Sequence, residues 1–270
     1  MPPIFATSTF EHGNKANFDY TRSGNPNFKI LENVLKGIEN SNYCTVFNSG
    51  ISAVTAIVSS LKSGDTILCE SNLYGCTIRM FEKIFRKFGI QTSYFDFTNK
   101  EYIQQISKVK PSLIWLESPT NPLLKILNLK EICSEANLRK IPVVVDNTFC
   151  TAVIQKPLEL GATLSLISTT KFINGHSDAL GGAVITNDES WNNKMIFSQK
   201  SLGLNPSPFD CWLITRGLKT LPLRIAQQTE NAYFIANELN SHKLIDQLIY
   251  PFNKNHPQFE LAKSQMKIGG

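Results

Sequence analysis

The sequence of 270 residues has no apolar run close to the roughly 20 residues that a membrane-spanning helix needs. Its first residues, Met1-Pro2-Pro3-Ile4-Phe5, lack the basic and apolar regions of a signal peptide. Lysines are scattered along the chain, and no basic block stands beside a run of aromatic residues. We therefore expect a cytoplasmic protein with neither a membrane nor a nucleic acid as partner.

Metal-ligand and nucleotide-binding patterns are also missing. The six cysteines include no Cys-x-x-Cys pair, and the four histidines stand far apart, so we predict no metal site and no disulfide framework. The sequence contains neither Gly-x-x-x-x-Gly-Lys-Ser/Thr nor Gly-x-Gly-x-x-Gly, which disfavours a nucleotide site.

The pattern of apolar residues predicts an α/β fold. Asn25-Pro26 is typical of a helix start, and the apolar residues from Ile30 to Ile38 follow at helical spacing. Further helices are expected over 50–62, 77–88, 128–139 and 209–240, and strands over 66–70, 90–95, 113–118, 142–146, 163–169 and 182–186. Such alternation favours a mainly parallel sheet with helices on both faces.

Polar residues follow three of the predicted strands, at the edge where parallel α/β sheets bind ligands. The strand over 113–118 leads to Glu117 and Asn121, the strand over 142–146 ends at Asp146, and the strand over 163–169 leads to Lys171. An isolated aspartate here is usually a helix cap or turn, and an isolated lysine is usually a surface charge. A carboxylate and an amine on neighbouring buried strands suit pyridoxal phosphate (PLP), whose aldehyde bonds to a lysine and whose ring nitrogen needs an acidic partner.

A phosphate group needs backbone N–H groups at a helix start together with hydroxyl donors. The segment Asn48-Ser49-Gly50-Ile51-Ser52 predicts such a helix start, and Ser168 and Thr170 supply hydroxyl groups. The alternative is an ordinary helix cap with no ligand.

Five ordered segments carry a family resemblance. They are Tyr20-Thr21-Arg22-Ser23-Gly24-Asn25-Pro26, Tyr74-Gly75-Cys76-Thr77, Glu117-Ser118-Pro119-Thr120-Asn121-Pro122, Val145-Asp146-Asn147-Thr148-Phe149 and the stretch from Ser168 to Asp178. Together they resemble the cystathionine γ-synthase, cystathionine lyase and methionine γ-lyase family of PLP enzymes. The resemblance implies an aspartate-aminotransferase-like (fold type I) domain with a mainly parallel seven-stranded sheet. It also implies an arm over 1–24, a PLP-binding domain over 25–228 and the start of a C-terminal domain over 229–270.

The resemblance also implies roles for individual residues. Lys171 and Tyr74 would be catalytic, Lys171 by forming the Schiff base and moving protons, and Tyr74 by stacking on the ring. The cofactor would further contact Asp146 at the ring nitrogen, Thr148 as a support, and Gly50, Ile51, Ser168 and Thr170 at the phosphate. Tyr20 and Arg22 would reach that phosphate from a neighbouring subunit, which implies a homotetramer built from two dimers.

Substrate contacts are implied at three positions. Asn121 would hold the ring hydroxyl or the substrate carboxylate, and Asp19 and Arg79 would receive the far end of cystathionine. Cys76 resembles methionine γ-lyases, although a small buried thiol explains it equally well. The expected substrate is a sulfur amino acid whose C–S bond is made or broken at the γ-carbon, with methionine γ-lyase and cystathionine β-lyase as alternatives.

Two further alternatives remain open from the sequence. Family members continue past a segment like Gly269-Gly270 to an arginine that binds the substrate carboxylate, and no residue here takes that role. A truncated chain that binds PLP or family subunits without turnover is therefore one alternative. A PLP-free α/β binding protein is another, and it requires the pairing of Lys171 with Asp146 to be a coincidence.

Overall fold

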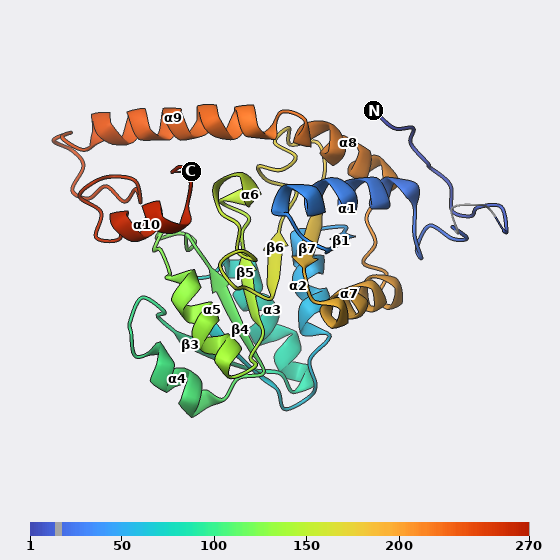
Figure 1. Cartoon of the computed structure of the whole chain (residues 1–270), viewed down its shortest axis with the longest axis horizontal. Helices are drawn as coiled ribbons and strands as arrows, with labels where there is room; N and C mark the ends of the chain where they lie inside the picture. Colours follow the sequence, from blue (N-terminus) through green and yellow to red (C-terminus); the bar gives the residue numbers. More distant parts are fainter. Residues whose placement is uncertain (14–17, 270) are drawn as a thin grey trace. The chain divides into compact units, whose positions relative to one another are not determined.

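A computed structural model describes residues 1–13 and 18–269 of the chain (Figure 1). Seven strands form one sheet in the order β1-β7-β6-β5-β4-β2-β3. The strands are β1 (Tyr43–Phe47), β2 (Thr66–Glu70), β3 (Gln91–Phe95), β4 (Leu113–Glu117), β5 (Val143–Asp146), β6 (Leu164–Ile167) and β7 (Gly182–Thr186). Pairing of β2 with β3 and β4, and of β4 with β5, is parallel, whereas β7 pairs antiparallel with β1 and β6. The mainly parallel seven-stranded sheet predicted from the sequence is confirmed.

Helices connect the strands, as expected for a parallel sheet. They are α1 (Pro26–Glu39), α2 (Gly50–Val58), α3 (Gly75–Lys83), the 3₁₀ helix η1 (Phe85–Phe88), α4 (Tyr102–Val109), α5 (Leu129–Leu138), α6 (Thr151–Ile154), α7 (Glu189–Ser201), α8 (Pro208–Leu218), α9 (Leu221–Leu239) and α10 (Phe259–Gln265). In the described part of the chain, no helix is both long and apolar enough to cross a membrane.

Two predicted helices have different boundaries in the structure. The helix expected over 50–62 ends at Val58, because Ser60 and Leu61 donate their N–H groups to carbonyls three residues back, at 3.1 and 3.0 Å. The helix expected over 77–88 is two elements, α3 and η1, separated at Ile84, whose ψ of −65° and φ of −109° depart from regular helix. Gly89 then ends η1 with a φ of 82°, a conformation that glycine adopts without steric cost.

The continuous helix expected over 209–240 was also wrong, since α8 and α9 are separate helices. Lys219 and Thr220 donate their N–H groups to carbonyls three residues back instead of four, so the helical ladder tightens and stops. Pro222 follows, and a proline cannot donate the N–H that a continuous helix would need there. Five further elements were not predicted from the sequence: β1, α4, α6, α7 and α10.

The chain divides into two compact units. One contains residues 1–61 and 164–221, and the other contains residues 62–163 and 222–270. The boundaries predicted from family resemblance, at residues 24 and 228, stay a prediction; residues 14–17 of the predicted arm and Gly270 at the end of the chain lie outside the described residues.

The unit of residues 1–61 and 164–221 is built around α1. Asn25 caps this helix by accepting from the Asn27 N–H at 2.9 Å, as its sequence predicts. Phe28, Leu31 and Leu35 are almost fully buried and lie on the face that packs on α8 and β1. The chain before α1 is tied to it, because Asn27 exchanges hydrogen bonds with the backbone of Phe5 and Pro3 at 2.8 and 3.0 Å.

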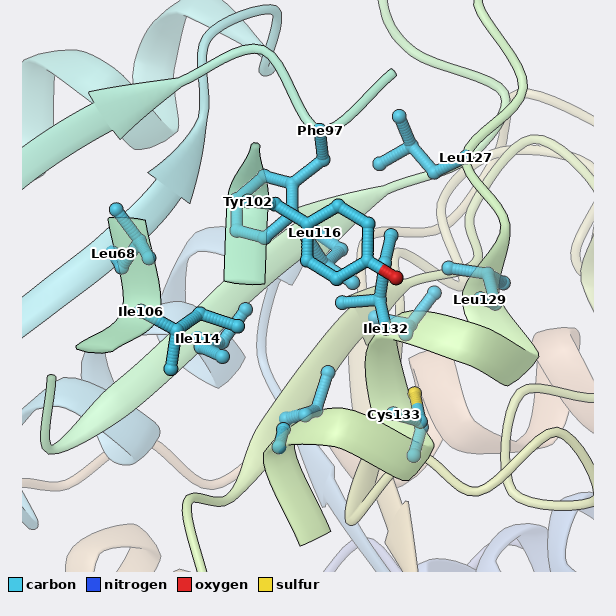
Figure 2. Close-up of a cluster of buried hydrophobic side chains, with 14 residues drawn as sticks. Leu68, Phe97, Tyr102, Ile106, Ile114, Leu116, Leu127, Leu129, Ile132 and Cys133 are labelled. Carbon is cyan, nitrogen blue, oxygen red and sulfur yellow. The ribbon is translucent and has the colours of Figure 1, made fainter. Parts of the chain in front are cut away.

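The other unit has its core between the sheet and helices α4 and α5. Figure 2 shows this cluster, in which Phe97 and Tyr102 stack with ring centres 6.0 Å apart. Strands β4 and β5 are apolar up to their last residue, and Val143, Val144 and Val145 have no exposed surface. A strand buried on both sides presents its first polar side chain only where it ends, which places Glu117 and Asp146 at one edge of the sheet.

The last residues of the chain belong to this same unit. The Gln258 side chain accepts from the Ile126 N–H at 2.9 Å and donates to the Ile126 carbonyl at 2.7 Å. The Gln265 amide donates to Gln155 at 3.1 Å, and the Lys267 N–H donates to the Ile154 carbonyl at 2.9 Å. These contacts attach α10 to the loops after β4 and β5.

Candidate functional site

The loop after β6 carries the predicted cofactor lysine. Lys171 is exposed and lies in a turn, in which its N–H donates to the Ser168 carbonyl at 3.3 Å and its carbonyl accepts from the Gly175 N–H at 2.8 Å. The Asn174 N–H also donates to the Thr169 carbonyl at 3.0 Å. The backbone on both sides of Lys171 is therefore fixed, while its amine is open to a ligand.

The start of α2 lies directly against this loop. Ser49 caps α2 by accepting from the Ser52 N–H at 3.1 Å. Gly50 is so close to Ser168 that a Cβ atom on Gly50 would stand 2.8 Å from the Ser168 Cβ and 3.0 Å from its hydroxyl oxygen. Within residues 1–13 and 18–269, no acceptor is recorded for the N–H groups of Gly50 and Ile51. A helix start with unused N–H groups beside a hydroxyl is a suitable place for a phosphate.

Thr170 is held by the peptide of Gly181, the residue before β7. The Thr170 hydroxyl accepts from the Gly181 N–H at 3.0 Å and lies 3.2 Å from the Gly181 carbonyl, to which it donates. The hydroxyl proton is thus used within the protein. These two hydrogen bonds attach the loop that carries Lys171 to the residue before β7. The Thr170 oxygen can still accept a further hydrogen bond, whereas its proton is already donated to Gly181.

The residues predicted to serve a neighbouring subunit lie on a hairpin before α1. Thr9 bridges Tyr20, and the Phe10 N–H donates to the Asp19 carbonyl at 2.8 Å. Tyr20 and Arg22 are exposed, and the Arg22 guanidinium lies 5.5 Å from the centre of the Tyr20 ring while it donates to the Lys200 carbonyl at 2.9 Å. The structure thus brings Asp19, Tyr20 and Arg22 together on one exposed hairpin.

Asp146 and Glu117 form a pair of carboxyl groups in the other unit. They are directly opposite each other in the parallel pairing of β4 with β5, so their side chains leave the same face of the sheet. One Asp146 oxygen accepts from the Thr148 N–H at 3.0 Å. Burial raises the pKa of Asp146 above its ordinary value, although the hydrogen bonds from Thr148 oppose that shift.

Tyr74 lies where α3 begins and contacts Glu117 of that pair. Its N–H donates to a Glu117 oxygen at 2.9 Å, and 42% of its surface is exposed, so one side of the ring is open to a ligand. A hydrogen bond between the Tyr74 hydroxyl and the Cys76 thiol raises the pKa of the phenol. The exposed Arg79 lies 3.8 Å from the Cys76 sulfur, so Tyr74, Cys76 and Arg79 form one polar cluster at the start of α3.

Asn121 lies apart from these contacts. It follows β4 in the turn Thr120–Leu124, where the Leu124 N–H donates to the Thr120 carbonyl at 2.9 Å. The peptide bonds before Pro119 and Pro122 are both cis. In the described part of the chain, no hydrogen bond of the Asn121 side chain is recorded, and its predicted role stays a prediction.

Each of the two units carries residues that fit one part of PLP. Gly50 packs so closely on Ser168 that no side chain fits at the start of α2. A phosphate bound to the backbone N–H groups of a helix start requires a position without a side chain. Asp146 is a carboxyl group held by hydrogen bonds from Thr148, and a protonated pyridine nitrogen is a suitable partner for it. The sequence analysis noted Glu117 at a strand end but gave it no role. Its contact with Tyr74 crosses 43 positions of sequence, and no local pattern predicts that contact.

Comparison with known proteins supports this interpretation. A probable cystathionine γ-synthase of Herpetosiphon aurantiacus is 39% identical to this chain over an alignment that covers 99% of this chain and 85% of that protein. Human cystathionine γ-lyase is 40% identical over an alignment that covers 98% of this chain and 66% of the human protein. The crystal structure of metB from Corynebacterium glutamicum superimposes on the whole chain with a TM-score of 0.97 at 38% identity, and the chain covers 71% of it. The family model of Cys/Met metabolism PLP-dependent enzymes matches residues 1–270, and the chain belongs to this family.

Proposed function

We propose that this protein makes or breaks the C–S bond at the γ-carbon of a cystathionine-type amino acid, with PLP bound through Lys171. The observation that carries the proposal is the loop after β6. It presents Lys171 three residues after Ser168, which packs against the start of α2. The amine of Lys171 and the hydroxyl of Ser168 thus belong to the same loop, and Ser168 is in contact with the start of α2. The relatives named γ-synthase and γ-lyase support the choice of reaction.

PLP supplies an aldehyde that bonds to amines and a protonated ring that accepts an electron pair from the substrate α-carbon. The chain's own residues would then perform separate tasks. The Lys171 amine would take the proton from the α-carbon and later act at the β-carbon. The backbone contacts with Ser168 and Gly175 fix the turn that carries this amine. The Asp146 carboxylate would hold the proton on the ring nitrogen, and Thr148 orients that carboxylate.

Other residues would bind and orient. Gly50, Ile51 and Ser168 would hold the phosphate, and Thr170 would fix the loop through Gly181. The open face of Tyr74 would stack on the ring. Asn121, Asp19 and Arg79 are proposed to contact the substrate, and Arg79 lies in the same cluster as Tyr74.

The direction and position of bond cleavage are tested by the products. From cystathionine and water, γ-elimination yields cysteine, 2-oxobutanoate and ammonia, whereas β-elimination yields homocysteine, pyruvate and ammonia. We expect 2-oxobutanoate. Release of pyruvate would indicate a cystathionine β-lyase, and methanethiol from methionine would indicate a methionine γ-lyase. The similar CalE6 protein of Micromonospora echinospora is named a methionine γ-lyase in one structure and a cystathionine γ-lyase in another. Bound PLP with none of these products, and with no cystathionine formed from cysteine and an O-acylated homoserine, would support the alternative without turnover.

Replacement of the lysine tests the cofactor assignment. Lys171→Ala should lose the yellow absorbance band of lysine-bound PLP and keep the fold, because no other residue in the loop carries an amine. Borohydride reduction of the wild type followed by peptide mapping should place the label on Lys171.

The matched control is Lys108→Ala, which removes an exposed lysine of α4 and should keep both the band and the label. A label on any lysine other than Lys171 would refute the assignment.

We also propose a homotetramer of two dimers and a cytoplasmic location. The exposed hairpin with Tyr20 and Arg22 supports the assembly, because it offers a phenol and a guanidinium to a neighbouring subunit. Analytical ultracentrifugation of the PLP-loaded protein should show a species of four chains, and a monomer with fully bound PLP would contradict this.

A further inference from the structure

Three neighbouring strands end in a carboxyl group. Glu70 is the last residue of β2, Glu117 of β4 and Asp146 of β5, and these strands lie side by side in the sheet. Glu70 has no exposed surface and Glu117 has 5%. A carboxyl group with so little exposure needs hydrogen-bond donors or an ion pair to carry a charge.

The hydrogen-bond donors around the two glutamates differ. Glu70 accepts from the N–H groups of Phe97 and Asn72 at 2.9 and 3.0 Å and from the Ser71 hydroxyl at 2.9 Å. Glu117 accepts only from the Tyr74 N–H among the recorded contacts of the described residues, and no ion pair is recorded for it. Several donors therefore surround the carboxyl group of Glu70, whereas one recorded donor contacts that of Glu117.

The charges that face Glu117 make its ionisation harder still. Burial, the charge of Asp146 and the charge of Glu70 raise the pKa of Glu117 from 4.5 to about 9, and only the Tyr74 N–H opposes this. A proton on Glu117 relieves the repulsion with Asp146 and leaves Asp146 free to ionise opposite a cationic partner.

We propose that Glu117 is a positioning residue of the cofactor site: as a neutral carboxylic acid it holds the Tyr74 amide, and thereby the Tyr74 ring, while Asp146 keeps the negative charge of the pair. The inference rests on the proposed PLP site, since it assigns Tyr74 and Asp146 to the ring of the cofactor. It concerns a residue that need not touch the cofactor itself.

The first test measures the dissociation constant of PLP in two variants. Glu117→Gln keeps a neutral group with an acceptor oxygen for the Tyr74 N–H, so its affinity should stay within about twofold of the wild type. Glu117→Met keeps a similar volume and loses the acceptor, so PLP should bind about tenfold more weakly. Hydrogen exchange of the peptide that contains Tyr74 should be faster in Glu117→Met than in Glu117→Gln.

A double-mutant cycle then separates positioning from a general structural effect. If Glu117 acts through Tyr74, the roughly tenfold effect of Glu117→Met should fall to about twofold or less when Tyr74 is already alanine. An unchanged tenfold effect in the Tyr74→Ala background would overturn the positioning role, as would wild-type affinity in Glu117→Met.

The second test needs no cofactor. In the cofactor-free protein, a pKa of Glu117 above its ordinary value means that the folded state binds an extra proton between pH 4.5 and about 9. The stability of the wild type relative to Glu117→Gln should therefore fall as pH rises through this window, by up to about tenfold in the folding constant per pH unit, and level off above it. Thermal melts of both proteins from pH 5 to 9 measure this difference.

The two tests fail in different ways. A constant difference between wild type and Glu117→Gln from pH 5 to 9 would show that Glu117 is already ionised and would overturn its neutral state. If the melts behave as expected but the wild type binds no PLP, the proposed function is wrong while the proton on Glu117 stands. If PLP binds and the cycle shows no coupling to Tyr74, the proposed function stands and the positioning role is wrong.

Discussion

Replacement of Gly50 by alanine tests the proposed phosphate site at a position where Ser168 leaves no space for a side chain. The new Cβ atom would stand 2.8 Å from the Ser168 Cβ, 3.0 Å from its hydroxyl oxygen and 3.3 Å from its Cα. Carbon atoms in contact prefer a separation of about 3.5–4.0 Å, so a shift of at least about 0.7 Å is needed. Ser168 follows β6 directly, and its backbone has little freedom to move away because β6 is fully buried.

The size of the effect follows from what that shift would disturb. Overpacking of this kind costs about 1–3 kcal/mol of stability. A hydrogen bond to a charged acceptor contributes about 1.5–3 kcal/mol, and separating Ser168 from α2 would remove at least one such bond to the phosphate. Because about 1.4 kcal/mol corresponds to a factor of ten, PLP should bind about 10- to 100-fold more weakly to Gly50→Ala.

The assay is a fluorescence titration of the cofactor-free protein with PLP, together with a thermal melt. Gly37→Ala is the control in the same unit, because a Cβ on this α1 glycine meets nothing within 4 Å. It should raise stability by up to about 1 kcal/mol and leave PLP affinity unchanged. Wild-type affinity in Gly50→Ala would refute the assignment of the phosphate to the start of α2.

Two more predictions concern Asp146 and Gly217. Asp146→Asn keeps an oxygen for the Thr148 N–H but loses the negative charge, so the fold should persist. Exchange of the substrate α-proton, measured by NMR in deuterated water, should fall by orders of magnitude. Near-normal exchange would show that Asp146 has only a structural role. A Cβ on Gly217 would stand 2.3 Å from the Asn174 carbonyl oxygen, so Gly217→Ala should lower the free energy of unfolding by about 1–3 kcal/mol. An unchanged denaturation midpoint would show that α8 can move away from Asn174 without loss of stability.

Strands β4, β5 and β6 were predictable because they are buried on both faces. The runs ending at Glu117 and Asp146 contain only apolar residues before the acid, so their type and their ends follow from composition alone. The same rule could have identified β1, whose residues Tyr43–Phe47 are aromatic, β-branched or small and pair with β7. Helix ends were harder, since the break between α8 and α9 depends on a shift from four-residue to three-residue hydrogen bonds at Lys219 and Thr220.

The site was predictable as a set of residue types but not as a set of contacts. Family motifs name Ser168, Thr170 and Lys171, yet they do not show that the Thr170 hydroxyl is used by Gly181 or that Gly50 touches Ser168. These contacts join residues that are 11 and 118 positions apart, and they depend on which backbone groups the fold leaves without partners.

Glu70 and Glu117 show why residue identity alone does not determine charge at this edge of the sheet. Both are glutamates at the ends of buried strands, and both have little or no exposed surface. Phe97 and the loop after β2 turn donors toward Glu70, whereas Glu117 receives one N–H and faces Asp146. The backbone donors thus decide where a negative charge is stabilised, and the proton carried by Glu117 lets Asp146 meet a cationic ring without a second charge beside it.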